Sequence, residues 1–283
     1  MICPPCGVAR RAPGGASQGQ SPALTPGQRR RRRRLDYAAE LEELSANSLD
    51  RVKWKPPKVA EVVDRRVVVN PRQARELLTA VTYVGRPWRG RHLRAFFGCI
   101  YFAALRPGEV KALRKDGCDL PATGWGKLTL SRSRPQSNKR WTDSGEAFDD
   151  RGLKHRAEND TRSVPIPPEL VMILREHIEE FGTAADGRLF RTATGGMIFD
   201  TTHTWAVART LALTPDQGAS PLAARPYDLR HAAVSLWLNG GVAATEVANR
   251  AGHSVEVLLR VYAKCIDGGE ETANRRIDEA LAA

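Results

Sequence analysis

Five residues near the end of the chain have the types and the spacing for chemistry on a phosphate ester. They are Tyr227, Arg230, His231, His253 and Tyr262. A tyrosine hydroxyl can attack phosphorus and form a covalent intermediate. An arginine can bind the non-bridging oxygens of a phosphate with two parallel N–H donors. This segment therefore predicts a site that acts on a phosphodiester, with Tyr262 as the nucleophile.

A second cationic residue, from elsewhere in the chain, is expected to complete the site. Arg106 directly follows an apolar run, and Pro107 can open the next helix. Glu109, three residues on, can hold the arginine or the adjacent backbone. A guanidinium fixed beside a helix N-terminus is a suitable phosphate ligand. Arg106 is therefore a candidate phosphate ligand. The alternative is an ordinary arginine whose side chain lies in solvent.

Lys154 is the second cationic candidate. It lies in a long polar stretch between two strand-like segments, residues 127–131 and 162–167. From an extended hairpin, a lysine could reach a phosphate or donate a proton to a leaving oxygen. The alternative is a loop lysine that is simply solvated.

The apolar periodicity predicts the elements that position these residues. The two strand-like segments favour a small antiparallel sheet, and residues 67–69 form another short strand-like run. The rest of the pattern is helical, so the expected fold class is α+β, mainly α-helical. Helices are expected at residues 70–81, 91–105, 107–114, 168–181, 201–213, 226–239 and 245–251, and after Ser254.

In these motifs the chain resembles the tyrosine recombinases, the phage-integrase family, over roughly residues 67–265. The family's second box, usually HDLRHT, is matched by YDLRHA, which begins at Tyr227. Its Leu-Gly-His landmark is matched by Ala-Gly-His ending at His253, and Tyr262 follows that histidine by nine residues, as the family's nucleophile does. Its first box, of the form GLRxSE, is matched by ALRPGE. Its hairpin lysine precedes a strand of the form RxVPL, as Lys154 precedes RSVPI.

The resemblance implies a site-specific DNA recombinase that cleaves and rejoins DNA through a 3′-phosphotyrosyl intermediate. Arg106 and Arg230 would bind the phosphate oxygens, and His253 would donate a further hydrogen bond. Tyr262 would attack phosphorus, and Lys154 would protonate the leaving 5′-oxygen. No cofactor and no metal ion are implied.

Tyr227 is the residue that departs from the family's pattern. The family usually has a histidine there, which assists the proton of the nucleophile. A tyrosine can form hydrogen bonds but is a poor base at neutral pH. We therefore expect Tyr227 to shape the site. We expect His231, one residue after Arg230, to point elsewhere on the helix and to be structural.

The composition divides the chain into three parts. Residues 1–34 contain eight arginines and no acidic residue, and they have almost no apolar periodicity, which predicts a disordered basic tail. Residues 35–66 are expected to hold one helix and a proline-containing linker, and residues 67–283 the catalytic domain. The helix either packs on the following domain or is the last helix of the family's core-binding domain, which would then be truncated.

The net charge of +12 depends largely on the tail, because removing its arginines leaves +4. Bulk charge is therefore weak evidence for a DNA-binding fold.

Five cysteines do not form a disulfide scaffold in a chain of this length, and Cys99 and Cys265 are expected to be buried thiols. Cys3 and Cys6 lack a second pair that would favour zinc. No apolar run has the length of a membrane span, so a reducing cytoplasm, in association with the nucleoid, is the expected location.

The expected partners follow from the resemblance. They are double-stranded DNA recombination sites, further copies of the chain in a homotetramer on DNA, and an accessory directionality factor, in the integration or excision of a mobile element. One alternative is a non-catalytic DNA-binding remnant that lacks the clamp domain. Another is a type IB topoisomerase, which shares the tyrosine nucleophile but has further domains that nothing here indicates.

Overall fold

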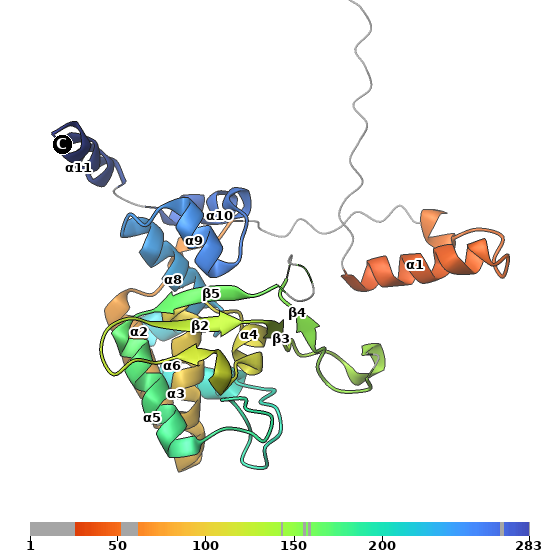
Figure 1. The fold of residues 1–283 in the computed structure, drawn as a ribbon, viewed down its shortest axis with the longest axis horizontal. Coiled ribbons are helices and arrows are strands. Elements are labelled where there is room, and N and C mark those ends of the chain that lie inside the picture. The colour runs from red at the N-terminus through yellow and green to blue at the C-terminus, as the bar shows by residue number, and fades with distance from the viewer. Residues whose placement is uncertain are drawn as a thin grey trace, which may run out of the picture. The chain divides into compact units, whose positions relative to one another are not determined.

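The computed structural model describes residues 26–51, 62–142, 144–154, 157, 160–266 and 269–282. The chain divides into two compact units, Met1–Ala60 and Glu61–Ala283 (Figure 1). Cys3, Cys6 and most of the predicted basic tail lie outside the described residues.

The first unit contains helix α1 (Pro26–Glu40) and the 3₁₀ helix η1 (Ser48–Arg51). The Nδ2 group of Asn47 donates to Asp36 Oδ1 at 2.6 Å and connects the loop to α1. The sequence predicted a helix from Leu35 and a disordered tail before it, but α1 begins at Pro26 and contains the whole arginine run. Arginine is a good helix former, so the run can extend the helix.

The second unit begins before the expected domain start at residue 67. The backbone N–H of Val63 donates to Val261 O at 2.8 Å, and the Val63 side chain is buried. The end of the predicted linker therefore belongs to the folded unit. The expected strand at residues 67–69 is absent from the described part: the 3₁₀ helix η2 (Arg65–Val67) occupies its start, and Asp64 accepts from the N–H of Arg66 as its cap.

Most predicted helices are present, with shifted ends. Asn70 accepts from the Gln73 N–H at the start of α2, as expected for a cap. Proline begins several helices because its fixed φ suits the first turn. It also starts α3 four residues before the predicted position. The helices of this region are α2 (Pro71–Val81), α3 (Pro87–Phe102), α4 (Pro107–Ala112), α5 (Pro168–Phe181) and α6 (Thr202–Ala212).

The C-terminal region is a series of short helices. The segment expected to be a loop after α6 contains the one-turn helix α7 (Pro215–Ala219), capped by Thr214. The other elements are α8 (Asp228–Asn239), α9 (Ala244–Ala251), α10 (Val255–Tyr262), the 3₁₀ helix η5 (Ala263–Cys265) and α11 (Gly269–Leu281).

The sheet confirms the predicted antiparallel pairing of the two strand-like segments. Strands β1 (Cys118–Asp119), β2 (Gly126–Leu130) and β5 (Arg162–Ile166) lie in the order β1-β2-β5, with Leu128 opposite Val164. A separate hairpin pairs β3 (Arg132–Ser133) with β4 (Arg151–Gly152). Two 3₁₀ turns flank these strands, η3 (Lys115–Gly117) and η4 (Lys139–Trp141).

Two groups of buried apolar residues hold the second unit together. The larger group joins α2, α3, α5 and α6 to one face of the sheet. The smaller group joins α8, α9 and α10, and it includes both Tyr262 and Cys265. In Figure 1 the strands β2 and β5 run between these two sets of helices. The α+β, mainly helical fold class is therefore confirmed, as is the burial of Cys99 and Cys265.

None of the helices in the described part of the chain is long and apolar enough to cross a bilayer.

Candidate active site

Arg106 lies at the corner between α3 and α4. Ala104 turns the chain with a positive φ of 49°, and Arg106 then becomes the residue before the first turn of α4. The backbone N–H of Arg106 donates to Glu109 Oε2 at 2.9 Å, and its Nη1 donates to Oε1 at 2.9 Å. The carboxylate of Glu109 therefore holds both the backbone and the guanidinium, as the sequence predicted.

Arg162, the first residue of β5, binds the same carboxylate. Its Nη1 and Nη2 atoms donate to the two Glu109 oxygens at 3.1 and 2.7 Å, and both side chains are almost fully buried. Burial alone would raise the pKa of Glu109, but the charges of Arg162 and Arg106 outweigh it and lower that pKa to about 2. Glu109 therefore stays ionised and fixes two guanidinium groups at once.

Arg162 had no predicted role in the chemistry, although the strand pattern contained a signal for it. Side chains two residues apart lie on the same face of a strand. Arg162 therefore shares a face with Val164 and Ile166, which are buried. An arginine on a buried face needs a partner of opposite charge, and Glu109 is that partner.

Arg230 is fully buried in the first turns of α8. Its Nη1 donates to the backbone oxygen of Ala104, and its Nη2 donates to that of Ala251 and to His253 Nε2, the last at 2.8 Å. Burial lowers the pKa of this guanidinium, and the nearby charge of Arg106 lowers it further. Arg230 thus joins the corner that carries Arg106 to the corner that carries His253.

Gly252 lies where the two arginine groups meet. It ends α9 in the left-handed conformation, with φ of 66°, which favours glycine. Its backbone oxygen accepts from Arg106 Nη2 at 2.7 Å. A Cβ atom at this position would overlap Arg162 Nη1. The glycine of the Ala-Gly-His landmark is therefore required both for the turn and for the close approach of the guanidinium.

His253 follows this turn and is mostly buried. Because its Nε2 accepts from Arg230, the ring proton lies on Nδ1. Burial lowers the pKa of His253 to about 3, with further contributions from the charges of Arg230 and Arg106. The imidazole is therefore neutral at physiological pH. Within the described residues its buried Nδ1 has no hydrogen-bond partner, so one donor remains unused.

Tyr262 ends α10 and exposes none of its side chain. Its hydroxyl oxygen lies 3.0 Å from His231 Nδ1, and its ring stacks against that of His253 with 6.2 Å between centroids. Burial raises the pKa of the Tyr262 hydroxyl, and the charge of Arg230 only partly offsets this. The phenol is therefore protonated at neutral pH and requires a base when it reacts.

His231 contacts Tyr262 directly, so the expectation that it points elsewhere on the helix is wrong. Tyr227, at the start of α8, lies edge-on to the His231 ring with 5.0 Å between centroids. The ring of His231 therefore contacts the rings of both Tyr227 and Tyr262. The spacing of four residues between Tyr227 and His231 was the available signal, because such residues share a helix face.

Lys154 lies just after β4, at the end of the hairpin, and its side chain is exposed. Burial lowers the pKa of Lys154, and the positive charges of Arg106 and Arg151 lower it further. Arg106 is thus close enough to Lys154 for its charge to affect that pKa. The other predicted cations, Arg106 and Arg230, are in direct contact with the His253 segment.

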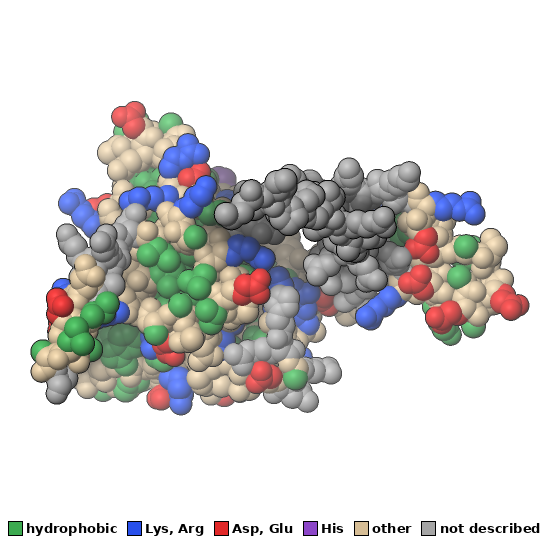
Figure 2. All heavy atoms as spheres, turned by 90° about the horizontal axis from the view of Figure 1, so that it is seen from above, with side chains coloured by type: hydrophobic (Ala, Val, Ile, Leu, Met, Phe, Trp, Pro, Cys, Tyr) green, Lys and Arg blue, Asp and Glu red, His purple; other side chains and the backbone are tan. Residues whose placement is uncertain are grey.

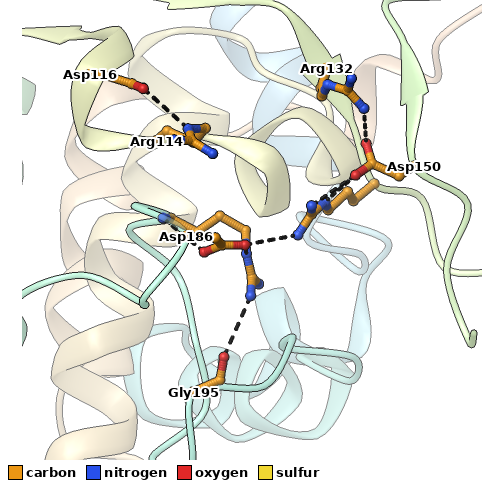
Figure 3. A network of polar contacts seen from close by, with 8 residues as sticks. Arg114, Asp116, Arg132, Asp150, Asp186 and Gly195 are labelled. Atoms are coloured by element: carbon orange, nitrogen blue, oxygen red, sulfur yellow. Dashed lines mark hydrogen bonds and ion pairs between the residues drawn. The ribbon is translucent and has the colours of Figure 1, made fainter.

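A network of ion pairs fixes the hairpin that carries Lys154 (Figure 3). Asp150, directly before β4, accepts from Arg134 Nη2 at 2.8 Å and from Arg132 Nη1 at 3.3 Å. Arg134 also reaches Asp186, in the loop after α5, at 3.5 Å. The two strands of the hairpin are thus joined to each other and to the body of the unit.

Comparison with known proteins identifies solved structures that share the fold of this chain. No family model matches the chain, and no curated protein matches it. Residues 82–397 of a variant of the Tn1549 transposon integrase, in complex with transposon right-end DNA, align with a TM-score of 0.58 at 15% identity, covering 88% of this chain and 76% of that one. The same integrase with circular-intermediate DNA gives a TM-score of 0.56 at 15% identity, covering 86% and 76%.

The XerH site-specific recombinase, bound to its palindromic difH substrate, aligns with a TM-score of 0.50 at 15% identity, over 76% of this chain and 52% of that one. At 15% sequence identity, the similarity shows a shared fold and no more. The chain therefore has the fold of the catalytic domains of tyrosine recombinases and integrases.

Proposed function

We propose that this protein is a site-specific DNA recombinase that cleaves and rejoins DNA through a 3′-phosphotyrosyl intermediate. The observation that carries the proposal is an excess of buried positive charge beside a tyrosine hydroxyl. The groups of Arg106, Arg162 and Arg230 lie around the single carboxylate of Glu109, whose pKa responds to all three. Uncompensated charge in a buried site favours an anionic ligand, and a phosphodiester fits two-pronged guanidinium donors.

In the proposed reaction, Arg106 and Arg230 bind the non-bridging oxygens of the scissile phosphate. His253 donates its Nδ1 proton to the same group. These donors stabilise the extra charge that develops on the pentacoordinate phosphorus, and because they are held by Glu109, Gly252 and backbone oxygens, they need little reorganisation.

Tyr262 forms the bond to phosphorus while the bond to the 5′-oxygen breaks, and Lys154 supplies the proton that this oxygen needs. The phosphotyrosyl ester retains the energy of the original ester, so a 5′-hydroxyl from another strand can reverse the step without ATP. The lowered pKa of Lys154 makes it a better proton donor than an ordinary lysine. Because Tyr262 is buried, α10 must shift when DNA binds so that the hydroxyl can reach phosphorus.

The remaining parts of the proposal concern partners and organisation. The protein acts on double-stranded recombination sites as a homotetramer, assisted by an accessory directionality factor, in the cytoplasm at the nucleoid. The complexes of the Tn1549 integrase and XerH with DNA support the first of these. Residues 35–66 hold the last helix of a core-binding domain and a linker. Sedimentation of the protein on a two-site DNA tests the assembly: a complex with fewer than four copies would exclude the tetramer.

The decisive experiment uses a pool of nicked duplexes with randomised sequence, which trap a covalent adduct because the short cleaved strand diffuses away. Strands that become linked to the protein are recovered and sequenced. We expect wild-type protein to yield adducts at a defined sequence and Tyr262→Phe to yield none, since the variant lacks the attacking oxygen.

Tyr101→Phe is the matched control, because Tyr101 is another buried tyrosine, in α3, and is expected to keep its adducts. If wild-type protein binds duplexes but forms no adduct, the alternative of a DNA-binding remnant without catalysis replaces the proposal. Adducts formed by Tyr262→Phe would assign the nucleophile to another residue.

A further inference from the structure

The contact between His231 and Tyr262 is the closest one that the nucleophile makes with a potential base. His231 Nδ1 lies 3.0 Å from the hydroxyl oxygen, which is within hydrogen-bond reach. The rings of His231 and Tyr262 are tilted at 56° with 5.7 Å between their centroids. A nucleophile and a base in this arrangement form the local unit that activates a hydroxyl for attack.

We propose that His231 is a catalytic residue that accepts the proton of Tyr262 as the tyrosine attacks phosphorus, in place of any base at position 227. The assignment rests on the proposed phosphotyrosyl chemistry and adds to it the identity of the proton acceptor.

The position of His231 on α8 allows it to replace a base at position 227. Residues four apart on a helix lie on the same face, one turn from each other. The ring of Tyr227 lies edge-on to His231 at 75° and packs against the imidazole. The phenol of Tyr227 is no better a proton acceptor than the phenol of Tyr262 itself. The imidazole of His231, one turn further along α8, can accept the proton.

The charge state of His231 is suitable for this role. Burial lowers its pKa to about 4, Asp228 opposes this, and Arg230 and Arg225 contribute in the same direction as burial. Tyr262 from α10 contacts this ring, and the pKa of His253, in the turn before α10, responds to His231. The imidazole is thus neutral at pH 7, and with its proton on Nε2 it presents a free lone pair on Nδ1 to the hydroxyl.

His253 is the other imidazole near the nucleophile, but it is already engaged. Its Nε2 accepts from Arg230 at 2.8 Å, and its Nδ1 carries the proton. It therefore offers a donor to the phosphate and has no lone pair for Tyr262. The two histidines have opposite roles because their hydrogen-bond partners fix opposite tautomers.

The Tyr262 oxygen forms a bond to phosphorus, and its O–H bond breaks with the proton passing to His231 Nδ1. The P–O5′ bond breaks, and the leaving oxygen takes a proton from Lys154. In rejoining, the 5′-hydroxyl attacks, its proton returns to Lys154, and the departing tyrosine oxygen recovers its proton from His231.

The test is single-turnover cleavage of a nicked substrate whose sequence wild-type protein selects. His231→Asn places an amide oxygen near the position of Nδ1, so it can accept the hydrogen bond but cannot take the proton. We expect its cleavage rate at pH 7 to fall by about 10²–10⁴-fold, with unchanged DNA affinity and with a rate that rises steeply toward alkaline pH. His203→Asn, an exposed histidine of α6, is the matched control and should cleave at the wild-type rate.

Chemical rescue provides a second measurement. His231→Ala should be slow, and added imidazole should restore its rate by at least tenfold, because a free base can enter the space left by the side chain. A folded His231→Asn that cleaves as fast as wild type, or faster, would overturn the assignment and leave His231 as a hydrogen-bonded support for the resting tyrosine. If wild-type protein itself forms no adduct, the proposed function fails, and the assignment fails with it.

Discussion

At the scale of single residues, the site depends on one carboxylate. Glu109 accepts four hydrogen bonds from the backbone and side chain of Arg106 and from the side chain of Arg162. Breaking a buried ion pair by removing one partner is costly, because the other charge remains buried without compensation. Glu109 therefore affects both the stability of the fold and the placement of the guanidinium groups.

Glu109→Gln tests this dependence, because the amide keeps the shape and removes the charge. We expect the free energy of unfolding to fall by about 3–5 kcal/mol, measured by urea denaturation, and adduct formation to slow at least tenfold. Glu76→Gln is the control, since the Arg72–Glu76 pair on α2 is solvent-exposed, and exposed pairs contribute little to stability. Equal effects of the two changes would contradict the central role of Glu109.

At the scale of elements, the β3–β4 hairpin decides where Lys154 lies. The hairpin has few backbone pairs, since each strand has two residues. Its geometry therefore depends on side chains, above all on Asp150 and Arg134 (Figure 3). The sequence analysis identified Lys154 from its place before the next strand, but the ion pairs that hold it come from residues far apart in the chain.

Asp150→Asn should loosen this hairpin and move Lys154 away from the leaving oxygen. We expect cleavage of an ordinary nicked substrate to slow by about 10–100-fold, since general-acid catalysis contributes about 10²–10⁴-fold when complete. A substrate with a 5′-bridging sulfur should be cleaved at the wild-type rate, because a thiolate leaves without a proton. Asp116→Asn, in the exposed Arg114–Asp116 pair of the same region, should change neither rate. A deficit that the sulfur substrate does not repair would mean that Asp150 acts on something other than Lys154.

At the scale of the whole molecule, buried histidines connect stability to pH. His92 and His177 lie against each other among Phe181 and Phe190, with 4.6 Å between their ring centroids. Burial is the largest cause that lowers their pKa values, to about 3 and about 4. They are neutral in the folded protein at pH 5, whereas histidines of the unfolded chain begin to gain a proton below about pH 6.5.

This difference predicts a loss of stability in acid. Between about pH 6.5 and the folded pKa values, the unfolded chain binds more protons than the folded one, so the free energy of unfolding falls as pH falls. The slope is about 1.4 kcal/mol per pH unit for each histidine once it is fully protonated in the unfolded chain. Urea denaturation at pH 7, 6 and 5 measures it, and His177→Phe should reduce the slope. A free energy of unfolding that stays constant from pH 7 to 5 would show that these histidines are not buried in solution.

The surface charge visible on one face of the molecule is mixed in sign (Figure 2). On the face seen in Figure 2, the Lys and Arg side chains are interspersed with Asp and Glu side chains. The formal charge of +12 is therefore a poor guide to where DNA binds. The arginine group around Glu109 has a defined geometry, and under the proposed function it would recognise a phosphate by hydrogen-bond direction as well as by charge.

The sequence by itself determined the local features of this protein. Amphipathic spacing and proline or asparagine at helix starts predicted α2 and α4, and alternation predicted the β2–β5 pair. The order and spacing of Arg106, Arg230, His253 and Tyr262 were sufficient to predict a tyrosine recombinase site. The predicted elements are confirmed because helix caps and strand faces depend on residues only a few positions apart.

Only the tertiary structure decided which groups meet. Arg162 and Glu109 are 53 positions apart, Arg230 and Ala104 are 126 apart, and His231 and Tyr262 are 31 apart. Such contacts depend on how α3, α8 and α10 cross and on which side of each helix faces inward, and no local pattern contains that information. For the same reason, the burial of Tyr262 and its pairing with His231 followed from packing, while the sequence could establish only that a tyrosine and a histidine were present.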